Sequence, residues 1–81
     1  MGNVSIVAKI FPEDSAKIEG IKNEISKRMK LADSKIEDIA FGAKILMVMV
    51  IVPDNEGGDI ESKLKEIPGV SEVQIDDISL V

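Results

Sequence analysis

The fold of this chain is decided by residues 38–52, which read DIAFGAKILMVMVIV. A Phe-Gly pair interrupts the approach to a run of apolar residues that has no polar alternation, and Pro53 stops the run. An antiparallel strand with one face in water alternates apolar with polar residues, so a strand that is apolar on both faces has to be covered on both. In a chain of 81 residues, the second cover can be another protein.

The segment before this run predicts a strand followed by a helix. Residues 4–10 place apolar side chains at every second position, which is the pattern of a strand with one buried face. Pro12 ends this strand, and residues 13–15 supply acidic and N-capping side chains for a helix. The apolar positions of that helix recur every three or four residues, at Ile18, Ile21, Ile25 and Met29.

The remaining segments predict two more strands and a second helix. After a connection at residues 31–34, residues 35–39 form a weak, charged strand of the kind found at a sheet edge. Residues 54–59 are interpreted as a turn into the second helix, which ends at Pro68-Gly69, and a last strand begins at Val70. The apolar positions of the second helix are Ile60, Leu64 and Ile67.

The element order βαββαβ predicts an α+β, ferredoxin-like sandwich in one domain over residues 1–81. We expect a four-stranded antiparallel sheet with both helices on one face and with the first and third strands in the centre. The helices would leave the other face open, and contiguous apolar area on such a face usually marks an interaction surface. The expected open-face side chains are Val7, Phe11, Ile45, Met47, Met49 and Ile51.

Composition argues against several classes of function. With 15 acidic and 10 basic side chains, a net charge of -5 and no Tyr or Trp, we expect no direct nucleic-acid binding. The chain has no Cys and no His, so thiolate nucleophiles, imidazole bases and Cys/His metal clusters are absent. We therefore expect no enzyme activity, no catalytic residue, no metal and no cofactor. The apolar runs are shorter than the ~20 residues of a membrane span, so we expect no membrane partner and a cytoplasmic location.

The chain resembles the archaeal elongation factor one beta family. The resemblance rests on Ile-Ala-Phe-Gly at residues 39–42, the basic residue and long Val/Met/Ile strand after it, and the acidic Glu-Gly-Gly turn at residues 56–58. It covers almost the whole chain. It implies a guanine-nucleotide exchange domain whose partner is the elongation factor one alpha GTPase, in its GDP-bound and nucleotide-free states.

The resemblance also implies which residues contact the GTPase. Phe41 and Gly42, with Ala40 beside them, correspond to the loop that contacts the nucleotide-binding domain. A second contact is the C-terminal tail, which carries over to Ser79, Leu80 and Val81. In eukaryotic relatives a lysine next to the terminus enters the magnesium site, whereas residues 76–81 here contain no basic residue. Lysine-for-magnesium substitution is therefore not carried over, and a buried core position remains the alternative for Phe41.

A second function of a different class is also compatible with the sequence. A ferredoxin-like regulatory module could self-associate through its open sheet face and bind a small ligand between subunits. Weak self-association through that face is also compatible with the exchange function. Mass measurement in solution, with and without the GTPase, separates the two functions.

Overall fold

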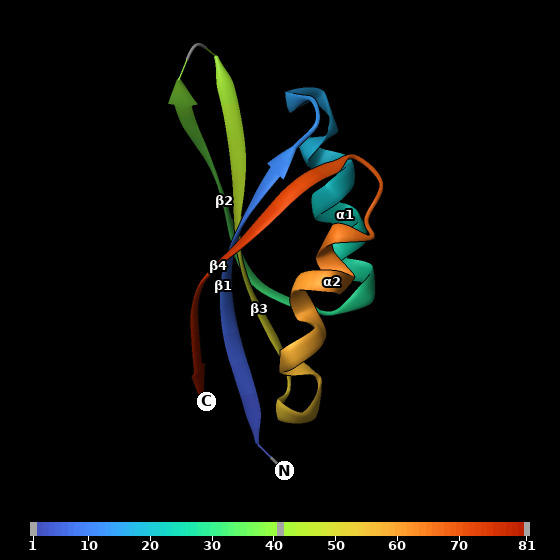
Figure 1. Cartoon of the computed structure of the whole chain (residues 1–81), viewed down its shortest axis with the longest axis vertical. Helices are drawn as coiled ribbons and strands as arrows, with labels where there is room; N and C mark the ends of the chain where they lie inside the picture. The colour runs from blue at the N-terminus through green and yellow to red at the C-terminus, as the bar shows by residue number, and fades with distance from the viewer. Residues whose placement is uncertain (1, 41, 81) are drawn as a thin grey trace.

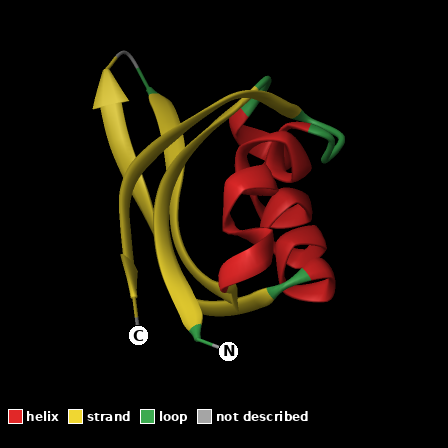
Figure 2. Ribbon diagram, turned by 60° about the horizontal axis from the view of Figure 1, so that its bottom comes forward, coloured by secondary structure: helices red, strands yellow, loops and turns green. Residues whose placement is uncertain are grey.

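A computed structural model of the chain describes residues 2–40 and 42–80. The elements in chain order are β1 (Asn3–Pro12), the 3-10 helix η1 (Ser15–Lys17), α1 (Ile18–Arg28), β2 (Lys30–Ala40), β3 (Ala43–Pro53), the 3-10 helix η2 (Asp54–Asp59), α2 (Ile60–Lys65) and β4 (Val70–Leu80). The strands form one antiparallel sheet in the order β2-β3-β1-β4. Both α-helices lie on one side of it (Figure 2). The predicted ferredoxin-like sandwich is confirmed, with β1 and β3 in the centre.

The core lies between the helices and one face of the central strands. Residues opposite each other in β1 and β3 point to the same face, and on the helix side all of them are buried. The pairs are Val4 with Val52, Ile6 with Val50, Ala8 with Val48 and Ile10 with Leu46. The helices add Ile18, Ile21, Ile25, Ile60 and Leu64 to this cluster. Burial of each large aliphatic side chain stabilises the fold by about 1.5–3 kcal/mol.

The start of the first helical segment follows its predicted capping. Asp14 precedes η1, and its Oδ1 accepts a hydrogen bond from the backbone N–H of Ala16 at 3.0 Å. The turn then continues into α1, where Arg28 Nε lies 3.6 Å from Glu24 Oε1 on the outer side.

In the part of the chain that the structure describes, no helix is long and apolar enough to cross a membrane.

Three segments differ from their predicted structure: the connection at residues 31–34, the C-terminal tail from Ser79 and the turn at residues 54–59. Residues 31–34 belong to β2 and are not a connection. A β-bulge between Leu31 and Asp33 interrupts the alternation of side chains, so the sequence pattern did not indicate a strand there. In the pairing of β1 with β4, Val7 lies opposite Asp77 and Ala8 lies opposite Ile75. Asp76 is therefore an extra, bulged residue of β4, and the strand continues past it to Leu80. Residues 54–59 form the 3-10 helix η2 instead of a simple turn.

Candidate partner-binding surface

The hairpin of β2 and β3 carries part of the predicted contact loop. Its tip lies beyond both helices at one end of the molecule (Figure 1). Ala40, at the end of β2, pairs with Ala43 at the start of β3. Gly42 has φ +78°, in the left-handed region that residues other than glycine rarely adopt. Phe41 lies outside the described residues, so its predicted role stays a prediction.

Two large apolar side chains of β2 are exposed. Ile36 is 47% exposed although the residue opposite it, Leu46, is fully buried. Ile39, at a register shift near the end of β2, is 53% exposed. No function was predicted for Ile36, whose only signal in the sequence is an apolar residue within a charged edge strand. Both isoleucines therefore present exposed apolar side chains on the half of β2 nearer the hairpin tip.

Two of the predicted C-terminal contact residues, Ser79 and Leu80, are part of the sheet. Ser79 pairs with Ser5 and Leu80 with Val4, so the chain through Leu80 is a strand and not a free tail. The Ser79 hydroxyl donates a hydrogen bond to Asp77 Oδ2 at 3.0 Å. The Leu80 side chain is 79% exposed, and Ile78, which the sequence analysis did not single out, is 55% exposed. Val81 lies outside the described residues.

The two predicted contact segments lie at opposite ends of the sheet. Val4 pairs with both Leu80 and Val52, so the end of β4 is level with the end of β3. The nine residue steps from Ala43 to Val52 correspond to about 30 Å at ~3.3 Å per residue. The longest dimension of the molecule is 42 Å. A partner that contacts both segments must therefore span most of this protein.

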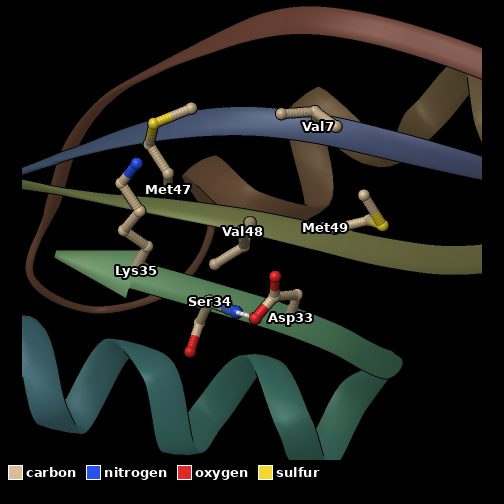
Figure 3. Close-up of a pocket in the computed structure, with 7 residues that line it drawn as sticks. All are labelled: Val7, Asp33, Ser34, Lys35, Met47, Val48 and Met49. Carbon is tan, nitrogen blue, oxygen red and sulfur yellow. Dashed lines mark hydrogen bonds between the residues drawn. The ribbon is translucent and has the colours of Figure 1, made fainter.

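The open face of the sheet is less exposed than predicted. Met49 is 37% exposed, Val7, Met47 and Ile51 are half-buried, and Ile45 is only 3% exposed. Charged side chains of β2 flank this apolar strip, and Figure 3 shows Lys35 beside Met47. A shallow hollow of about 120 Å³ lies here, lined by Val7, Asp33, Ser34, Lys35, Met47, Val48 and Met49.

The polar and charged side chains of the described residues all lie at least partly exposed at the surface. Over residues 2–40 and 42–80 no polar or charged residue is buried, and no group of three acidic side chains is arranged to hold a metal ion. Ion pairs lie on the surface, from 2.9 Å for Lys63 and Glu56 to 3.9 Å for Lys65 and Glu61. Such exposed pairs contribute at most about 1 kcal/mol each.

Comparison with known proteins identifies the family. Residues 5–81 match the EF-1 guanine nucleotide exchange domain. The chain belongs to this family. It is 37% identical over 89 residues to elongation factor 1-beta of Archaeoglobus fulgidus, with 100% of both chains covered. It is 39% identical over 85 residues to elongation factor 1-beta of Methanothermobacter thermautotrophicus, with 96% of both covered.

A solved structure supports the fold alone. The crystal structure of the ACT domain from GTP pyrophosphokinase of Chlorobium tepidum superposes on this EF-1 exchange domain with a TM-score of 0.64. The match covers 94% of this chain and 100% of the ACT domain, at 15% sequence identity. The two share the four-stranded sheet with helices on one face, whereas family membership supports a role in nucleotide exchange during elongation.

Proposed function

We propose that this protein promotes release of GDP from the elongation factor one alpha GTPase. The observation that carries the proposal is the match of residues 5–81 to the EF-1 guanine nucleotide exchange domain, which includes all but the first two residues of β1 and all the other strands and helices. The hairpin tip supports it, because Gly42 holds a left-handed turn beside Phe41 at a point clear of the helices. The factor performs no covalent chemistry in this proposal.

The hairpin suits insertion into a partner because of how it is built. Backbone pairing between β2 and β3 continues from Lys30 and Ile51 to Ala40 and Ala43, so a long hydrogen-bonded ladder supports the tip. A pre-organised projection loses little conformational freedom on binding, which lets more of its contact energy act on the GTPase. Exposed Ile36 and Ile39 provide apolar area behind the inserted tip.

Exchange requires only a difference in affinity. A factor that binds the nucleotide-free GTPase more tightly than the GDP-bound form weakens GDP binding by the same ratio, because the coupling is reciprocal. A thousandfold acceleration of release needs about 4 kcal/mol of barrier reduction. One well-packed aromatic anchor can supply at least half of this in a protein interface, and Phe41 has that role in the proposal.

The C-terminal strand has the smaller role. Residues 76–81 contain no basic side chain, so no ammonium group from this segment competes with the magnesium ion. Leu80 instead presents an exposed apolar side chain about 30 Å from the hairpin tip. It provides a second contact that orients the factor on the GTPase.

Affinity measurements with two forms of the GTPase test the proposal. Titration of the factor should show markedly tighter binding to the nucleotide-free GTPase than to the GDP-loaded form. The Phe41→Ala variant should lose most of that difference, whereas Leu80→Ala should keep it. Equal affinity of the intact factor for both forms would refute the exchange function, because such a factor shifts no population.

A further inference from the structure

The sheet face opposite the helices carries an apolar strip on β3 bordered by a row of charges on β2. Residues opposite each other in antiparallel strands point to the same face, so the register fixes which charge lies beside which apolar side chain. The pairs are Lys30 with Ile51, Asp33 with Met49, Lys35 with Met47 and Glu37 with Ile45. The charge row on β2 thus follows the apolar strip residue by residue.

The charges on β2 are antisymmetric about the middle of the strand. In order they are positive, negative, positive and negative, at Lys30, Asp33, Lys35 and Glu37. The midpoint is Ser34, which pairs with Val48 of β3. Reversing the strand direction about that midpoint places Lys30 on Glu37 and Asp33 on Lys35. A symmetric order, such as positive, negative, negative and positive, would instead oppose like charges.

We propose that two copies of this chain associate face to face through this strip. The twofold axis lies between the two sheets and runs across the strands at the level of Val48. A twofold interface uses the same patch on both copies, so the patch must complement itself. Lys30 then faces Glu37 of the second copy, and Asp33 faces Lys35 of the second copy, so each interface contains four opposite-charge contacts.

The same rotation matches the apolar side chains. Met49 faces Met47 of the second copy. Ile51 lies level with Ile45 of the second copy, which is only 3% exposed and adds little contact area. The hollow of about 120 Å³ includes Val48 in its lining and therefore lies on the axis (Figure 3). Methionine side chains are flexible enough to fill an irregular gap of this kind. Because Met49 is only 37% exposed, the apolar area is modest and the association is reversible.

The acidic side of β4 restricts the contact to one half of the face. β4 presents Glu72, Asp76 and Asp77 near this surface, and Asp76 Oδ2 is paired with Lys9 Nζ at 3.7 Å. Because the axis runs across the strands, the rotation stacks β4 on β4 of the second copy and brings these acids toward each other, so the two β4 strands must stay apart. Packed sheets cross at about 30°, so one region near the axis stays in close contact. In this proposal the close region lies over β2 and β3, because there the opposite charges of the two copies face each other.

Charge reversal tests the pairing. Sedimentation of the chain alone, at low salt and over a range of concentrations, should show a reversible monomer–dimer equilibrium. Lys30→Glu or Glu37→Lys, each alone, opposes like charges and should weaken the dimer at least tenfold. An equimolar mixture of these two variants should restore it, because each reversed charge then meets its opposite. The double variant in one chain should also restore it.

Control variants separate this interface from other effects of charge. Lys27→Glu and Glu19→Lys change the same charges on the exposed surface of α1, and they should leave the dimer unchanged. Met49→Lys should abolish it. Pairing of two β2 edges would align the same charges but would leave Met49 uncovered. A dimer that survives Met49→Lys, a mixture that stays monomeric, or a monomeric parent chain at every concentration would each overturn the proposal. No GTPase is present, so the result does not depend on the exchange function.

Discussion

Replacement of Gly42 by alanine should destabilise the hairpin through backbone conformation alone. A Cβ built on Gly42 meets no atom within 4 Å, so no steric clash is created. The φ of +78° is the whole cost, because alanine in the left-handed region loses about 1–2 kcal/mol relative to glycine. For a domain of this size, 1 kcal/mol shifts the melting temperature by roughly 4–8 °C. We therefore expect Gly42→Ala to melt at least about 4 °C below the parent chain.

Gly20→Ala is the matched control, because it makes the same chemical change in α1. A Cβ on Gly20 also meets nothing within 4 Å, but the residue is helical. Alanine is favoured there by about 0.5–1 kcal/mol, so this variant should melt above the parent chain. Thermal unfolding followed by circular dichroism measures both variants. If Gly42→Ala melts at or above the parent temperature, residues at the tip do not need a left-handed turn and the reasoning about the hairpin is wrong.

Three further predictions concern the core, the surface and the charge of the factor. Leu64→Ala should cost about 2–5 kcal/mol in chemical denaturation, because Leu64 is fully buried in the core; a cost below 1 kcal/mol would contradict the described packing. Phe41→Ala should slow stimulated GDP release at least tenfold with little change in melting, whereas Leu80→Ser should slow it less than tenfold; the reverse ranking would move the main contact to the C-terminal strand. Raising salt should slow association with the GTPase far more than dissociation, because the net charge of -5 steers encounter with a basic surface; equal responses of the two rates would limit the charge to solubility.

The fold was predictable because its strongest elements have clear periodicity. The unbroken apolar run at residues 45–52 predicted a strand that is apolar on both faces, and the spacing of Ile18, Ile21 and Ile25 predicted the helix that covers one of them. β2 was harder, since the bulge between Leu31 and Asp33 moves the side chains that follow it to the other face. No sequence motif in this segment predicts a β-bulge.

The candidate site was less predictable, for reasons that depend on particular residues. The Phe-Gly pair located the turn, where Gly42 has a positive φ. Residues 79 and 80 were predicted to be part of a tail, but they pair with Ser5 and Val4 and belong to a strand. Pairing partners that are distant in sequence cannot be identified from one segment alone. Exposure of Ile36 and Ile78 also depends on where the helices end, which is a property of the folded chain.

Release of a fluorescent GDP analogue from the elongation factor one alpha GTPase tests the exchange function most directly. The preloaded GTPase is mixed with excess unlabelled GDP, with and without this protein, over a wide range of factor concentrations. The release rate should rise with factor concentration and approach a plateau, and Phe41→Ala should remove most of the increase. A release rate that stays unchanged at every factor concentration would contradict the proposed function.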